Sequence, residues 1–157
     1  MAEDRTPFDG SLVLSPGCVI YIGPGGVAET HVHHAVQLVV AREAPFRFSL
    51  DGPSVPAYTA LVPAGVAHAL DARGAHVAIV LFERHGPYGR VLDRLARDGL
   101  SHAQHDQLLA QPFPTNERAV EAVKRWSAIL VGDSRTSAPS REVRRAIAEL
   151  GRRLAHQ

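Results

Sequence analysis

The feature that most constrains the fold is a series of short apolar runs in the first half of the chain. Each run is rich in Val, Ile, Leu or aromatic residues, and segments such as GPGG, DGPS and PAG separate one run from the next. Short strands at regular spacing with Gly/Pro turns are typical of a sandwich or barrel. The sequence therefore predicts a β-domain over residues 1–86, with strands at 18–22, 36–41, 46–50, 57–62 and 76–82.

The hydrophobic pattern becomes helical after residue 86. Segments 92–100, 101–111 and 114–132 have helical character, and we expect residues 87–132 to form a helical extension. Apolar residues in the third segment recur at steps of three and four, which places them on one helix stripe: Val120, Val123, Trp126 and Leu130. Together with LDRLA at 92–96, this stripe offers more apolar helical surface than one side of a small barrel needs, so the sequence predicts a homodimer formed by these helices.

The last part of the chain, residues 133–157, has the composition of a linker followed by a helix. Its first residues are small and polar, and Pro139 and Ser140 provide a helix-start signal. Apolar residues then recur at helical spacing: Val143, Ile147, Leu150 and Leu154. We therefore expect a basic amphipathic helix near the end of the chain.

Composition excludes several function classes. The 157 residues include 17 Lys and Arg against 16 Asp and Glu, so no global field attracts nucleic acid or an acidic membrane. The single cysteine cannot form an intrachain disulfide, and the first residues lack a signal-peptide pattern. No apolar run approaches the roughly 20 residues that cross a bilayer. We expect a cytoplasmic protein with no membrane partner.

Histidines are the most informative residues for function. Three of the nine lie within four positions, at His31, His33 and His34. On a strand without a bulge, His31, His33 and Gln37 share one face and His34 points to the other. His68 follows a Pro/Gly turn and opens a strand-like segment, so it is the candidate for a ligand from a second strand.

Imidazoles in this pattern suit a transition metal. Two histidines two residues apart on one face can occupy adjacent positions on an ion, about 2.0–2.1 Å from it for zinc. Neutral imidazoles favour zinc, copper, nickel or ferrous iron over calcium or magnesium. Gln37 adds a neutral amide oxygen. The alternative is a metal-free pocket in which the same side chains hydrogen-bond an organic ligand.

The spacing of these residues resembles the two sequence motifs of the cupin superfamily. The resemblance covers residues 11–83 and rests on Gly25-x5-His31-x-His33-x3-Gln37 and Pro63-x-Gly65-x2-His68. It implies an α+β protein: a cupin-like antiparallel β-barrel (double-stranded β-helix or jelly roll) followed by C-terminal helices. It also implies that the motif residues line the barrel interior. Metal-dependent members usually have Glu at the position of Gln37, Gly at that of Ala44 and Asn at that of Ala72.

A narrower resemblance uses the whole chain. The HxHx3Q and PxGxxH motifs, the helices after them and the segment Arg141–Leu154 together resemble the sensor domain of AraC-type transcription regulators. The resemblance implies a small-molecule effector, a homodimer, and DNA binding only through a separate helix-turn-helix domain. Segment 133–157 would then be the linker and first helix of that domain, whose remainder we expect to be absent from this chain.

Two other functions remain open at this stage. A metal-dependent cupin enzyme, a dioxygenase or isomerase, would use the same four residues as its metal site, with Glu29 or Glu83 offered as a general base. An interaction or storage protein with a vestigial pocket is the third. The sequence favours the non-enzymatic sensor and assigns no catalytic residue.

Overall fold

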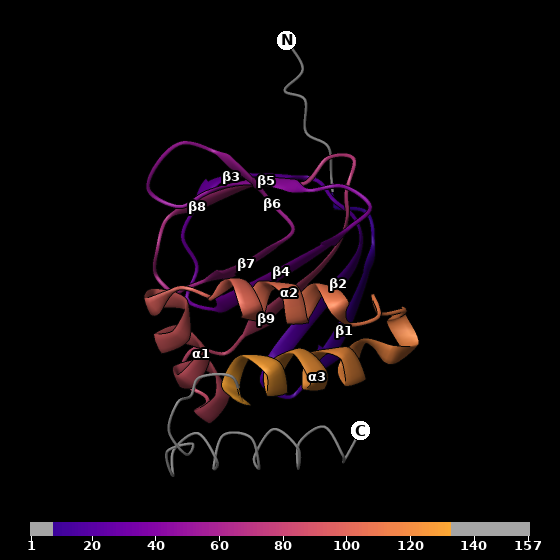
Figure 1. The fold of residues 1–157 in the computed structure, drawn as a ribbon, viewed down its shortest axis with the longest axis vertical. Helices are drawn as coiled ribbons and strands as arrows, with labels where there is room; N and C mark the ends of the chain where they lie inside the picture. Colours follow the sequence, from indigo (N-terminus) through magenta and orange to yellow (C-terminus); the bar gives the residue numbers. More distant parts are fainter. Residues whose placement is uncertain (1–7, 133–157) are drawn as a thin grey trace.

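The computed structural model describes residues 8–132, which form two β-sheets and a layer of helices (Figure 1). The strands are β1 (Ser11–Ser15), β2 (Cys18–Pro24), β3 (Val27–His31), β4 (Val36–Arg42), β5 (Phe46–Ser49), β6 (Val55–Ala57), β7 (Thr59–Val62), β8 (His68–Asp71) and β9 (His76–Phe82). The helices are α1 (Pro87–Asp98), α2 (His102–Ala110), the 3-10 helix η1 (Asn116–Arg118) and α3 (Ala119–Gly132).

Both sheets are antiparallel throughout. The five-stranded sheet has the order β1-β2-β9-β4-β7, and the four-stranded sheet has the order β3-β8-β5-β6. From β2 onward the chain passes repeatedly from one sheet to the other, which is the path of a jelly roll. The strand predicted at 57–62 is two strands, because the chain crosses between the sheets at Tyr58. Strands β1 and β3 lie outside the predicted runs, and β8 is the strand-like segment expected from His68 onward.

The inner strands of the five-stranded sheet are buried on both faces. One face meets the four-stranded sheet through an apolar cluster that includes Val39, Phe46 and Leu70. The other face packs against the helices through a second cluster that includes Leu38 and Trp126. Strand β4 is therefore buried at six of its seven positions instead of alternating, as expected for a strand covered on both sides.

The backbone geometry requires glycine at two positions of the sequence motifs. A Cβ atom on Gly25 would lie 2.0 Å from the carbonyl oxygen of Ala72, where the loop before β3 passes the end of β8. The same loops are joined by a hydrogen bond of 2.8 Å from the Ala72 amide to the Gly26 carbonyl. Gly65 has a φ of +75°, a conformation that favours glycine. These residues fix the turns that lead into β3 and β8.

The apolar stripe of α3 does not supply a dimer interface. Val123, Trp126 and Leu130 are between 0% and 1% exposed in a single chain, because they pack on the five-stranded sheet and the neighbouring helices. The expectation of a homodimer rested on this stripe together with the apolar positions of residues 92–96. The α3 stripe packs into the core of its own chain and is not free, and the homodimer stays a prediction.

Helix α2 is fixed at its start and along its inner side. Ser101 and Gln104 form a capping box, in which each side chain bonds the backbone amide of the other. His105 also hydrogen-bonds Thr59 on β7 through its Nδ1 atom. These contacts attach the helix to the edge of the five-stranded sheet.

One sequence expectation lies outside the described residues, and another concerns the membrane. The predicted linker and final helix, with the stripe from Val143 to Leu154, fall in residues 133–157, outside the described residues. Within residues 8–132, no helix is long and apolar enough to span a membrane.

The burial of the α3 stripe predicts a stability effect. Leu130 is fully buried, so Leu130→Ala should lower the free energy of unfolding by about 2–5 kcal/mol through lost apolar burial and a residual cavity. Urea unfolding measures this change, and Leu109→Ala, at a side chain 42% exposed, should cost much less. An altered oligomeric state in sedimentation velocity, with unchanged stability, would contradict the intramolecular role.

Candidate metal centre

Three imidazoles meet where β3 and β8 pair. His31, the last residue of β3, lies opposite His68, the first residue of β8. The ring centroids are 4.4 Å apart for His31 and His68, 4.7 Å for His33 and His68, and 5.3 Å for His31 and His33. One nitrogen from each ring lies within 4.8 Å of the other two. The cluster has the dimensions of a set of ligands around one ion.

A β-bulge in β3 sets this pairing. Ala28 lies opposite Leu70, and an uninterrupted ladder would therefore place Thr30 opposite His68. The register shifts by one residue between Ala28 and His31, so His31 takes that position instead. Bulges commonly redirect a side chain in this way.

The structure corrects the single-strand interpretation of His31, His33 and Gln37. Strand β3 ends at His31 and β4 begins at Val36, so His33 lies in the connection that crosses between the two sheets. Side chains alternate only within one strand, so alternation does not explain why His33 faces His31. That part of the prediction was wrong. His34, in the same connection, is exposed.

Gln37 joins the cluster from the other sheet. It lies on β4, is 5% exposed, and its Oε1 atom is 2.7 Å from Nε2 of His33. The structure thus brings His31, His33, Gln37 and His68 together from β3, the crossing connection, β4 and β8.

Backbone carbonyl oxygens orient all three rings. In each ring Nδ1 lies near a carbonyl oxygen two residues away: 2.7 Å for His31 and Glu29, 3.0 Å for His33 and Ala35, and 2.9 Å for His68 and Val66. A carbonyl oxygen only accepts, so each Nδ1 carries the hydrogen and donates it. In a neutral ring Nε2 then has the lone pair, which is the state that a metal ligand requires.

The remaining atoms fit a bound cation. Nε2 of His68 is buried and finds no hydrogen-bond partner within residues 8–132. Nε2 of His33 also faces the amide of Gln37, whose Oε1 atom lies 2.7 Å away. Three imidazole nitrogens and one amide oxygen form a donor set that zinc, nickel, copper or ferrous iron accepts.

Burial keeps His68 in the neutral form. The side chain is 2% exposed, and its burial lowers the pKa of the imidazole below the ordinary value. The hydrogen bond to Val66 opposes this change, and the charges of His31 and His33 reinforce it. Since a protonated imidazole cannot bind a metal, the low pKa prepares His68 as a ligand.

Helix α1 holds the turn next to this cluster. Oδ1 of Asp93 accepts a hydrogen bond of 2.8 Å from the Ala64 amide, and Arg97 donates one of 2.9 Å to the Ala64 carbonyl. Arg97 and Asp93 also form an ion pair at 3.1 Å. The next amide, that of Gly65, donates to the carbonyl of His33 at 2.9 Å. We call this series of contacts the α1 clamp.

Sequence reasoning missed the α1 clamp. An Asp and an Arg four residues apart on a helix usually form a solvated surface pair, and nothing in the sequence places Ala64 between them. The two carboxylates offered as general bases are both exposed: Glu29 and Glu83. Neither belongs to the group of residues whose ligand atoms meet in the cluster.

Comparison with known proteins adds structural likeness only. No protein-family profile and no curated protein matches the sequence. Among solved structures, protein NMB1881 from Neisseria meningitidis is 17% identical and has a TM-score of 0.41, with 49% of this chain and 86% of that chain covered.

Two further structures give similar values. A cupin-2 domain containing protein from Shewanella frigidimarina is 12% identical, with a TM-score of 0.42 over 50% of this chain and 83% of that one. KdgF from Halomonas sp. is 16% identical and has a TM-score of 0.41, with 53% of this chain and 90% of that chain covered. Likeness at this level says nothing about activity. The strand order and register themselves show the fold implied by the sequence motifs: a cupin-like pair of antiparallel sheets followed by helices.

The low pKa of His68 predicts a pH-dependent stability for the metal-free protein. In the unfolded chain this histidine takes a proton at about pH 6.5, whereas the folded protein resists protonation to a lower pH. Its contribution to stability is complete above about pH 6.5 and is lost as the pH falls toward the folded pKa.

Urea unfolding at several pH values checks this. Stability should fall less steeply on acidification in His68→Asn than in the wild type, whereas His34→Asn, at an exposed histidine, should behave as the wild type. The same pH dependence in all three proteins would contradict the role of His68.

The α1 clamp predicts an effect on metal affinity from a residue that contacts no ligand side chain. Asp93→Ala removes the acceptor for the Ala64 amide, so the turn beside His33 should become less rigid. We expect zinc affinity to fall about tenfold, the lower end of the loss seen when residues that support metal ligands are replaced. Isothermal titration measures this, with Asp98→Ala, an exposed residue of the same helix, as the matched control. Equal affinities in both variants would show that the clamp does not support the cluster.

Proposed function

We propose that the protein holds a divalent transition metal through His31, His33, His68 and Gln37. The observation that carries the proposal is the buried Nε2 of His68, which has no hydrogen-bond partner among residues 8–132. Beside it lie two further imidazoles whose Nδ1 atoms are also oriented by backbone carbonyls. Zinc, nickel, copper and ferrous iron suit this donor set. When bound, such an ion supplies a Lewis-acidic position at which a small molecule with a donor atom can bind.

We further propose that this centre belongs to a sensor module of the kind found in AraC-type regulators, acting in the cytoplasm. The α1 clamp supports this proposal because it joins the connection that carries His33 to a helix on the far face of the five-stranded sheet. A change in the position of His33 on effector binding would therefore be transmitted to α1. In this proposal a separate domain makes any contact with DNA, and a homodimer would use a surface other than the buried α3 stripe.

A metal-dependent enzyme is the second candidate. The three clustered imidazoles favour this candidate, because many catalytic zinc sites have three protein ligands and some of them use three histidines. The exposure of Glu29 and Glu83 disfavours the general bases that the sequence offered. Sensing is therefore the preferred function, with binding of a small molecule rather than its conversion as the expected outcome.

Metal titration tests the first proposal. The purified protein, stripped with a chelator, should take up one equivalent of zinc or nickel at about neutral pH and lose it on acidification through about pH 6.5. His31→Ala, His33→Ala and His68→Asn should each weaken binding at least about tenfold, whereas His34→Ala should not. Unchanged affinity in the three variants would refute the assignment.

Hydrogen exchange tests the transmission to α1. Addition of zinc alone should slow amide exchange in residues 63–66 and in α1 of the wild type. In Asp93→Ala the effect should persist near His33 and diminish in α1. Equal protection of α1 in both proteins would argue against the clamp as the route.

A further inference from the structure

Strand β1 lies at the edge of the five-stranded sheet, and within residues 8–132 no strand pairs with its outer side (Figure 1). It carries the two most exposed large apolar side chains of the described chain, Leu12 at 66% and Leu14 at 75%. Val13, between them, packs toward the helix layer. Since side chains alternate along a strand, both leucines project from the opposite face. This edge therefore presents apolar surface to solvent.

The backbone groups of the same two leucines also point to the open side. On the other side of β2, the Gly17 carbonyl accepts a hydrogen bond of 2.9 Å from the Glu83 amide, next to β9. Successive residues of a strand direct their N–H and C=O groups to alternate neighbours, so Ile20, further along β2, bonds toward β1, where Val13 lies opposite it. Val13 is thus paired with β2, and the leucines on either side of it direct their N–H and C=O groups to the open edge.

Strand β1 lacks the usual protection of an exposed edge. Edge strands generally carry charged residues or proline, which prevent pairing with another chain. This strand has the sequence SLVLS, with neither. The adjoining η1 carries an exposed acid and an exposed base, Glu117 and Arg118, whose charges cancel. No net charge along β1 or η1 therefore opposes the approach of an identical surface.

The sequence of β1 reads the same in both directions. A two-fold axis through Val13 would pair two copies of the strand antiparallel, with Leu12 of each copy opposite Leu14 of the other. Each leucine pair would then exchange both of its N–H···O bonds. A shift of one residue would set leucine against Val13, whose backbone groups are already used by β2. A shift of two would leave a leucine opposite Gly10 or Pro16, so one register is favoured.

We propose that β1 pairs with β1 of a second copy of this chain, in the antiparallel register centred on Val13. The two five-stranded sheets would form one continuous sheet, with the leucines of the two strands covering one another on one face. The homodimer expected from the sequence would then form at this sheet edge instead of through the helices. The proposal does not depend on the metal centre or on the sensor function, so each can be tested separately.

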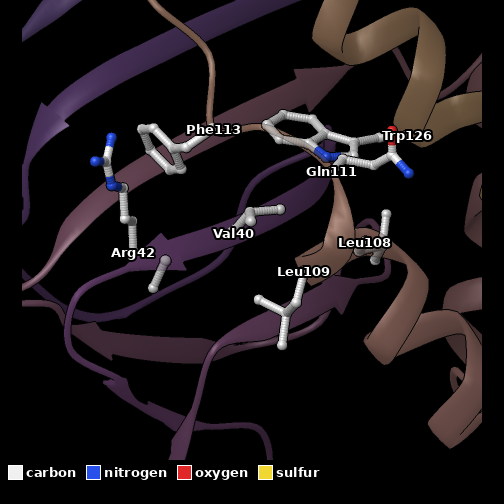
Figure 2. Close-up of a pocket in the computed structure, with 8 residues that line it drawn as sticks. Val40, Arg42, Leu108, Leu109, Gln111, Phe113 and Trp126 are labelled. Atoms are coloured by element: carbon white, nitrogen blue, oxygen red, sulfur yellow. The ribbon is translucent and has the colours of Figure 1, made fainter.

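Sedimentation velocity of the full chain tests the interface. The wild type should form a dimer with a Kd of about 10 μM or lower. Leu12→Lys or Leu14→Asp sets an unpaired charge against a leucine of the other copy, and each should weaken association at least about tenfold. Leu109→Lys, at an exposed leucine of α2 (Figure 2), is the matched control and should leave the dimer intact. Circular dichroism and urea unfolding show that the variants fold, as the exposure of these side chains predicts.

A mixture of the two variants tests the register. In a pair made of one Leu12→Lys chain and one Leu14→Asp chain, the introduced lysine and aspartate lie opposite each other, and the two remaining leucines also pair. Equimolar mixing should therefore restore a dimer that neither variant forms alone.

Amide hydrogen exchange gives an independent measurement. In the wild-type dimer the amides of Leu12 and Leu14 should be protected, whereas in Leu14→Asp the amide of Leu12 should exchange quickly. The amide of Val13, which faces β2, should be protected in both proteins. A wild type that is monomeric at about 100 μM, as expected if residues 1–7 cover the edge instead, would overturn the proposal. An unchanged dimer in both variants, or a mixture that stays monomeric, would also overturn it.

Discussion

Burial of the inner strands of the five-stranded sheet on both faces is the constraint on which the rest of the structure depends. Its inner face closes the barrel with the four-stranded sheet, and its outer face would expose side chains such as Ile20, Leu38 and Val80 without the helices. Each such residue contributes about 1.5–3 kcal/mol when buried. The helices are therefore part of the core. Their apolar stripe is consumed within one chain and is not left free for a partner.

The same double burial gives β4 two roles. On its inner side Gln37 reaches the histidine cluster, and on its outer side Val40 and Arg42 border a pocket against α2 and α3 (Figure 2). A strand in the middle of a sheet is rigid, because ladders on both sides hold it: β9 on one and β7 on the other. It is a suitable support for a cluster that needs a fixed side chain.

The histidine cluster depends on how the chain crosses between the sheets. A bulge aligns His31 with His68, the crossing connection brings His33 beside them, and the α1 clamp holds the turn that binds the His33 carbonyl. Sub-ångström placement of ligands requires support of this kind, since a loop alone samples many positions. The helices, which are remote in sequence from the motifs, thus contribute to the geometry of the centre.

The sequence by itself determined the period of each segment and the residues able to bind a metal. Short apolar runs separated by Gly/Pro turns predicted the barrel. Residue type and spacing identified His31, His33, Gln37 and His68. Only the tertiary structure decided the strand break after His31, the bulge, the α1 clamp and the surface against which Trp126 packs. The reason is physical: periodicity reports which residues avoid water, whereas the surface that covers them, whether a sheet, a helix or a second chain, is set by contacts between segments distant in sequence.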